Sequence, residues 1–142
     1  MELATDSRLV TLDRDECLML LRLETVGRVA IASGSDAPVM IPVNFFLHGE
    51  SPVFRTDERS VVGALGGVAM SLQVDRFDWY RHTGWSVLVT GFAEDASGQV
   101  DPSEIQTWAP GERLTVVRIR VSEIAGRRIE LDRAPLDARG YL

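Results

Sequence analysis

The chain contains no lysine, and all fifteen of its cations are arginine. A covalent Schiff base to pyridoxal phosphate requires a lysine amine, so this chemistry is excluded. Thiol and imidazole groups are also scarce, because the chain has one cysteine, Cys17, and two histidines, His48 and His82. These residues cannot supply an internal disulfide or a closed Cys/His zinc site. We therefore expect no metal site, and we expect Cys17 to act as a small buried apolar side chain.

Long apolar segments and basic clusters are missing as well. No apolar run approaches the ~20 residues that cross a bilayer, and the N-terminal MELATDSRLV lacks an apolar core of signal-peptide length. We therefore expect a cytoplasmic protein without a membrane partner. The net charge is −6, the sequence pI is about 4.9, and no basic cluster is longer than Arg127-Arg128. This balance argues against a nucleic-acid partner.

The remaining composition is that of one globular domain. The 142 residues are 45% hydrophobic and 25% charged, which is enough for a packed core. We interpret residues 1–142 as a single domain, with residues 10–130 as its core and residues 1–10 as a loose lead-in. Thr11 or Asp13 is expected to cap a helix that ends near Glu24.

Alternating, β-branched segments dominate the rest of the chain. They predict strands at residues 27–33, 39–47, 53–56, 68–75, 85–94 and 114–122, and a further short segment, 124–129, follows. Short helices are expected at 61–65 and 102–108, a polar loop at 76–84, and a bulge at Gly91. About six strands with short turns and no βαβ alternation predict a mainly β fold with flanking helices, either an antiparallel barrel or a sandwich.

The hairpin IPVNFFLHGESPVFRT, residues 41–56, ends in an unusual group of side chains. Arg55 and Thr56 close its second strand, and Arg59 and Ser60 follow within six residues. Guanidinium groups offer planar paired donors to phosphate, and hydroxyls and turn amides complete such a shell. The residues alone leave two interpretations open: a binding site for an anion, or a solvated strand end.

Several stretches, taken in order, resemble the flavin-binding split-barrel family of pyridoxamine 5'-phosphate oxidase-like proteins, in its small single-domain actinobacterial form. They are VGRVAI (26–31), IPVNFFLHG (41–49), VFRT (53–56), TGWSVLVTGFAE (83–94) and RIRVSEIAGRRI (118–129). The resemblance implies a six-stranded antiparallel split β-barrel that forms a homodimer. It also implies two equivalent FMN sites at the subunit interface, although some relatives use a deazaflavin, a heme or no flavin.

The resemblance also implies a set of cofactor-binding residues. They are Val43, Asn44, Phe54, Arg55, Thr56, Arg59, Ser60, Trp85 and Ser86. In the family, the strand pair that carries the first five lies against the flavin, and the turn after it receives the phosphate. The segment with Trp85 and Ser86 approaches from the barrel side.

One departure from the family pattern affects the phosphate site. Relatives commonly read F-R-T-x-x-G-T-K in this region, whereas this chain has Arg59 at the glycine and Val61 at the lysine. Either Arg59 replaces the missing cation, or the phosphate site is weakened.

The resemblance implies an FMN-binding protein, and a flavin-dependent oxidoreductase acting on a small molecule is the first hypothesis for its function. No catalytic side chain is predicted, because a minimal hydride transfer to a flavin requires no protein acid or base. The alternatives are a non-catalytic flavin-binding or sensor module, which the Val61 departure favours, and a deazaflavin-dependent reductase. A heme protein is disfavoured, because only His48 and His82 can offer an imidazole ligand.

Overall fold

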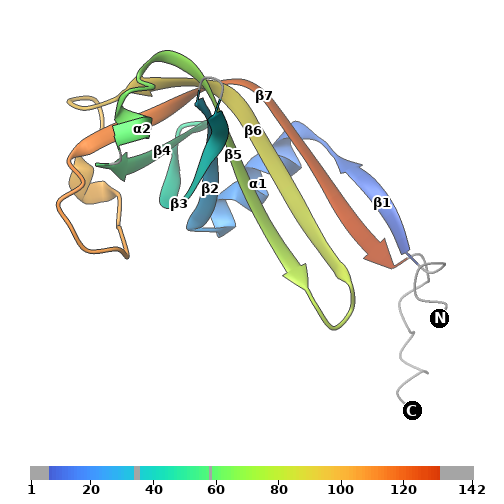
Figure 1. The fold of residues 1–142 in the computed structure, drawn as a ribbon. Coiled ribbons are helices and arrows are strands. Elements are labelled where there is room, and N and C mark those ends of the chain that lie inside the picture. The colour runs from blue at the N-terminus through green and yellow to red at the C-terminus, as the bar shows by residue number, and fades with distance from the viewer. Residues whose placement is uncertain (1–6, 34–35, 58, 132–142) are drawn as a thin grey trace.

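The computed structural model describes residues 7–33, 36–57 and 59–131, which form mainly antiparallel β-structure (Figure 1). The strands are β1 (Ser7–Leu12), β2 (Val26–Ser33), β3 (Asp36–His48), β4 (Ser51–Thr56), β5 (Gly66–Asp78), β6 (Thr83–Asp95) and β7 (Thr115–Leu131). The helices are α1 (Arg14–Leu23), the single turn α2 (Arg59–Val62) and the 3-10 turn η2 (Pro102–Glu104).

Six of the strands form a closed ring. Their order is β7-β4-β3-β2-β5-β6, and β6 pairs back with β7. Every pairing is antiparallel, which confirms the predicted six-stranded antiparallel barrel. Ring closure gives each of these strands two neighbours and so removes free sheet edges.

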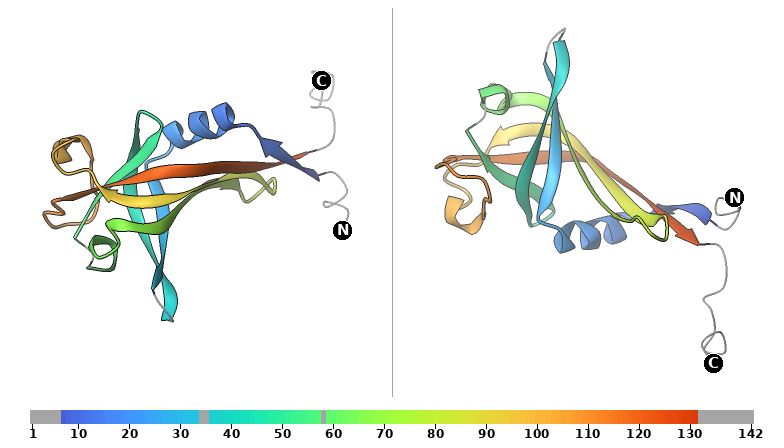
Figure 2. Two further views of the ribbon diagram at one scale, coloured as in Figure 1. Left: turned by 90° about the horizontal axis from the view of Figure 1, so that it is seen from above. Right: turned by 60° about the horizontal axis from the view of Figure 1, so that its bottom comes forward.

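A seventh strand, β1, lies outside the ring. It pairs with the far end of β7, from Ser7 opposite Leu131 to Leu12 opposite Gly126 (Figure 2). The prediction of a loose lead-in is therefore wrong for residues 7–10. The physical reason is the length of β7. Strand β4 pairs only with residues 115–118 of β7, so the backbone groups farther along that edge of β7 need another strand as their partner.

The long strand β7 also joins two segments that the sequence pattern separated, 114–122 and 124–129. It follows β6 along most of its length, and the register shifts between Thr90 and Gly91. A side chain at Gly91 would collide with the carbonyl oxygen of Arg120. The irregularity therefore occurs beside the predicted glycine, but the extra residue is Ser122 on β7, because Thr90 pairs with Glu123 and Gly91 with Val121.

Helix α1 closes one side of the barrel, where it packs against β7, β3 and β6. It begins after Asp13, whose Oδ1 accepts a 2.9 Å hydrogen bond from the backbone N–H of Glu16, and its C-cap is Glu24. Both ends agree with the sequence prediction. Cys17 is fully buried on its inner face, and burial raises the pKa of the thiol, so it remains protonated at neutral pH.

The molecule has two hydrophobic cores. The larger one fills the barrel and includes the fully buried Phe54, Val61 and Leu72. A smaller core packs the segment after β6 against the barrel, and its members are Val53, Ala96, Val100, Ile105 and Val116. Each fully buried aliphatic side chain contributes roughly 1.5–3 kcal/mol, so the small core is sufficient to hold this segment in place.

The remaining differences from prediction concern short elements. The helix expected at 102–108 is only the turn η2, and the helix expected at 61–65 is α2, which begins at Arg59. Most of the predicted loop 76–84 belongs to a hairpin, because β5 continues to Asp78 and β6 begins at Thr83. No helix within the described part of the chain is long and apolar enough to cross a membrane.

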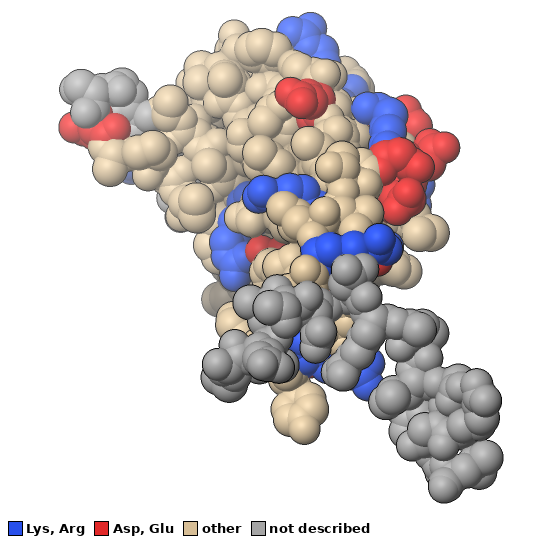
Figure 3. Space-filling view, turned by 90° about the vertical axis from the view of Figure 1, so that its right-hand side faces the viewer, with Lys and Arg blue, Asp and Glu red and all other residues tan. Residues whose placement is uncertain are grey.

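Basic and acidic side chains are interspersed on the face that carries β1 and the end of β7 (Figure 3). Several of them pair, such as Arg8 with Glu130 at 3.1 Å and Arg76 with Glu24 at 3.3 Å. Because such exposed pairs contribute about 0–1 kcal/mol each, the two cores remain the main source of stability.

Candidate functional site

One cavity, of about 220 Å³, lies where β3 and the end of β4 meet the loop before β7, and we call it the arginine cavity. Val43, Asn44, Arg55 and Thr56 line it, so the structure brings together four of the predicted cofactor-binding residues. The other lining residues are Ile41, Pro42, Thr107, Ala109 and Arg113. Two members of the strand-end group of the hairpin, Arg55 and Thr56, therefore line a cavity and do not face open solvent alone.

Two guanidinium groups define the electrostatics of the arginine cavity. Arg55 donates from Nη2 to Thr107 Oγ1 at 3.3 Å, and Arg113 Nη1 lies 3.4 Å from Asp57 Oδ1. The Nε atoms of both arginines are buried and have no hydrogen-bond partner among the described residues. A buried donor without a partner costs about 1–3 kcal/mol, and more when it is charged. The two guanidinium groups line the cavity together, and this paired donor set fits a phosphate group.

The side chain of Asn44 connects this cavity to the loop. Its Oδ1 accepts a 2.8 Å hydrogen bond from the backbone N–H of Trp108, and its Nδ2 donates to the Thr25 carbonyl at 3.3 Å. Both ends of the amide are therefore engaged within the protein. This leaves the backbone of β3 for contacts with a ligand, as the resemblance implied for Val43 and Asn44.

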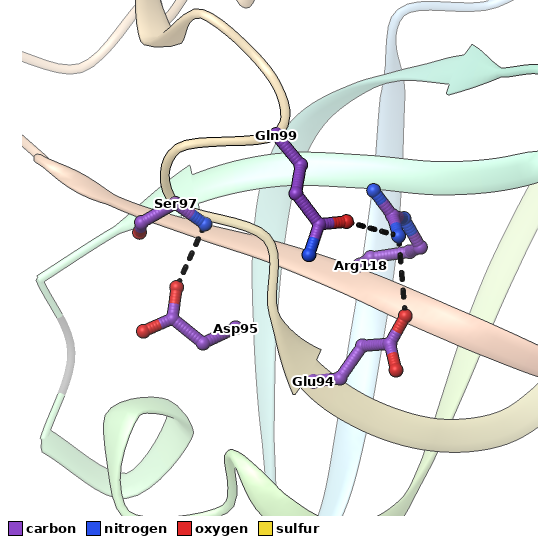
Figure 4. A network of polar contacts seen from close by, with 5 residues as sticks. All are labelled: Glu94, Asp95, Ser97, Gln99 and Arg118. Atoms are coloured by element: carbon purple, nitrogen blue, oxygen red, sulfur yellow. Dashed lines mark hydrogen bonds and ion pairs between the residues drawn. The ribbon is translucent and has the colours of Figure 1, made fainter.

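A network of polar contacts holds the beginning of the loop (Figure 4). Arg118 donates to Gln99 Oε1 at 2.8 Å and lies 3.4 Å from Glu94 Oε1, while the backbone N–H of Ser97 donates to Asp95 Oδ1 at 2.8 Å. Hydrogen bonds from the hydroxyl and the backbone N–H of Ser97 lower the pKa of Asp95. Together with the small core, this network positions the segment that continues to Thr107 and Arg113.

A second cavity, of about 440 Å³, lies on the face of β5, β6 and β7, and we call it the strand-face cavity. Its lining residues are Gln73, Ser86, Leu88, Ala125, Gly126 and Arg127, none of which lines the arginine cavity. Ser86 Oγ accepts a 3.2 Å hydrogen bond from Gln73 Nε2. Trp85 is partly buried against the main core. Within one chain, the predicted residue Ser86 therefore lines a different cavity from Val43, Asn44, Arg55 and Thr56.

Of the predicted residues whose side chains the structure describes, three line neither cavity: Phe54, Arg59 and Trp85. Phe54 is fully buried in the main core, so its side chain does not face a ligand there. Arg59 is exposed at the start of α2, and the side chain of Ser60 lies outside what the structure describes. Their contribution to the cofactor site stays a prediction. Val61, which stands where relatives carry lysine, is fully buried in the main core.

Sequence reasoning missed the contribution of the loop before β7. Thr107 is 52 residues from its hydrogen-bond partner Arg55, so no local pattern connects them. The available signal was the turn at Pro110-Gly111, which is followed closely by Arg113. Arg113 adopts a φ of 47°, in the left-handed region that residues with a Cβ rarely occupy.

Comparison with known proteins agrees with this fold. Residues 13–128 match the pyridoxamine 5'-phosphate oxidase family. The uncharacterized protein Rv0080 of Mycobacterium tuberculosis is 33% identical over 136 residues, which cover 87% of each chain.

Two solved structures extend the comparison. An FAD-binding protein from Mycobacterium smegmatis superposes with a TM-score of 0.66 at 26% identity, covering 85% of this chain and 98% of that one. A putative pyridoxamine 5'-phosphate oxidase from Corynebacterium glutamicum gives a TM-score of 0.69 at 25% identity, with the same coverage of 85% and 98%. The chain therefore belongs to the pyridoxamine 5'-phosphate oxidase family and has its split-barrel fold.

Proposed function

We propose that this protein binds FMN in the arginine cavity and acts as a flavin-dependent oxidoreductase on a small molecule. The observation that carries the proposal is the pair of guanidinium side chains, Arg55 and Arg113, that line one cavity together. A phosphomonoester has about 1.5 to 2 negative charges and three acceptor oxygens, which suits two guanidinium groups. The flavin-binding relative from Mycobacterium smegmatis supports a flavin as the group that carries this phosphate.

The rest of the cavity offers a surface for the flavin ring. Ile41, Pro42 and Val43 provide an apolar wall along β3, and its backbone provides hydrogen-bonding groups. When bound, a flavin supplies reversible hydride and electron chemistry. The protein's own contribution is to hold the phosphate, orient the ring and exclude water from one of its faces.

A homodimer is part of this proposal. The arginine cavity, at about 220 Å³, is smaller than the roughly 300–1,000 Å³ of typical cofactor sites. Its missing wall would come from the strand-face cavity of a second chain, which has Ser86 and the half-exposed Leu88. A two-fold axis brings the same two surfaces together twice, so each dimer would have two equivalent sites.

A non-catalytic flavin-binding or sensor module is the second candidate. It is favoured by the lining of both cavities, where no carboxylate, imidazole, thiol or phenol is found among the described residues. Such a lining suits either a hydride transfer without protein proton transfer, or storage of the flavin without a reaction. A deazaflavin in place of FMN is the third possibility, because the two cofactors share a tricyclic ring.

The visible spectrum of the freshly purified protein, followed by an FMN titration monitored by flavin fluorescence, tests the proposal. We expect saturable quenching, and loss of the flavin absorption when a reduced nicotinamide is added without oxygen. Tight binding without reduction by any donor would support the non-catalytic module. No quenching by FMN would contradict the proposal, and the same titration with a deazaflavin would then follow.

A further inference from the structure

We infer that Arg113, on the loop before β7, is the second phosphate-binding residue of the arginine cavity. It would provide the cation that the sequence pattern placed directly after β4. The inference rests on the proposed function insofar as the phosphate belongs to a flavin.

The position of the Arg113 side chain is the first argument. The side chain is 24% exposed, whereas that of its ion-pair partner Asp57 is 63% exposed. The guanidinium is thus drawn into the cavity while the carboxylate remains near solvent. Asp57 engages Nη1 only, and the buried Nε is left without a partner. Arg55 lines the same cavity, so one anion can accept hydrogen bonds from the guanidinium groups of both residues.

The backbone of Arg113 is the second argument. Its φ of 47° is disfavoured for any residue with a Cβ, and the nearby Gly111, with a φ of 117°, shows the residue type that such a turn prefers. Strained residues of this kind persist where the surrounding structure holds them, and they cluster at ligand sites. Glycine would adopt the backbone conformation at position 113 with less strain than arginine does. The guanidinium is what an arginine adds there.

The segment directly after β4 is the competing location. Val61 is fully buried in the core and carries no charge, and Arg59 is exposed on α2 and is not among the residues that line the arginine cavity. In this chain the loop, and not the strand end, therefore brings a second cation to Arg55. A site with two arginines favours a ligand with a phosphate dianion over the same ring without phosphate.

The experiment compares wild type with Arg113→Gly and uses Arg28→Ala as the matched control, because Arg28 is an exposed arginine that lines neither cavity. Glycine removes the guanidinium and relieves the backbone strain, so the unliganded variant should melt no lower than wild type. We expect Arg113→Gly to weaken FMN binding about 10- to 100-fold, the loss typical of one charge-assisted hydrogen bond. Its affinity for riboflavin, which lacks the phosphate, should stay the same. Arg28→Ala should bind both ligands as wild type does.

Inorganic phosphate provides a readout that does not require a flavin. We expect phosphate to raise the melting temperature of wild type and of Arg28→Ala, but not that of Arg113→Gly. If phosphate stabilises wild type but not Arg113→Gly, and FMN does not bind, the inference about Arg113 would hold and the proposed flavin function would be rejected. FMN binding that is unchanged in Arg113→Gly would overturn the inference and leave the flavin function intact. A wild type that responds to neither ligand would overturn both.

Discussion

The arginine cavity and the strand-face cavity are built in opposite ways. The first combines two strands with a loop that is distant in sequence, and Arg55 and Arg113 dominate it. The second lies on three neighbouring strands and presents apolar and small polar groups, such as Leu88 and Ser86. In the proposed function, the first would bind the charged end of a ligand, and the second, whose lining also includes Arg127, would cover its ring.

The largest expected effect comes from a charge placed on the strand-face cavity. Leu88 is 43% exposed, so Leu88→Arg should leave the barrel folded. If this face is covered by a second chain, an unpaired buried charge costs several kcal/mol and the dimer should dissociate. Light scattering after size-exclusion chromatography should then report a monomer that no longer binds FMN.

Leu23→Arg is the control for Leu88→Arg, because Leu23 is 67% exposed and lies at the end of α1. It should remain a dimer and bind FMN normally. A Leu88→Arg variant that is still dimeric and still binds FMN would show that the strand-face cavity is not part of the interface.

Arg55→Ala should produce the next largest effect, and it should be confined to the phosphate. Losing a charge-assisted hydrogen bond costs about 1.5–3 kcal/mol of binding free energy. Isothermal titration should therefore show weaker FMN binding and unchanged riboflavin binding. Arg28→Ala removes an exposed arginine that lies 3.9 Å from Asp75, and it should bind both ligands as wild type does. Equal losses for both ligands in Arg55→Ala would place the phosphate elsewhere.

A smaller effect is expected for Ser86→Ala in the strand-face cavity. The hydroxyl offers one neutral hydrogen bond, so its loss should cost about 0.5–1.5 kcal/mol. FMN and riboflavin should be weakened equally, in contrast to Arg55→Ala, because Ser86 is expected to face the uncharged ring. The same titrations measure this ratio, and a loss restricted to FMN would assign Ser86 to the phosphate.

The smallest effect concerns the loop that carries Arg113. Hydrogen bonds from Ser97 hold the pKa of Asp95 below its ordinary 3.8. A lowered carboxylate pKa stabilises the fold above that ordinary value, and the contribution is lost as the pH falls through the folded pKa. Asp95→Asn retains an acceptor without the charge. Between about pH 5 and pH 3, its melting temperature should therefore fall slightly less than that of wild type. A steeper fall in the variant would contradict this account.

Local patterns in the sequence predicted much of the fold. Asp13 as the helix cap, Glu24 as the helix end and the irregularity beside Gly91 all depend on residues close in sequence or on a backbone that only glycine allows. The strand β1 was missed, because its partner at the far end of β7 is 114 to 124 residues away. Pairing at such a distance leaves no periodic signal in a short stretch.

The candidate site shows the same limit. Arg55 and Thr56 were predicted because they end a strand next to a turn, and they do line a cavity. Arg113 was missed because the small core and the Arg118 network, not its neighbours in sequence, bring its loop to β4. Val61 was noticed as a missing cation, but only packing shows that its side chain belongs to the main core.

The most direct test of the central claim is a mixed-dimer measurement of FMN binding. Arg55→Ala disables the arginine cavity. Ala125→Trp, at an exposed position, fills the strand-face cavity. If each site combines the arginine cavity of one chain with the strand-face cavity of the other, the two changes in a mixed dimer fall in the same site. The second site then contains two unaltered cavities. We predict that mixing the two variants, each shown to be dimeric, restores wild-type FMN affinity in part of the sites. If the mixture binds no better than either variant alone, the shared site is contradicted.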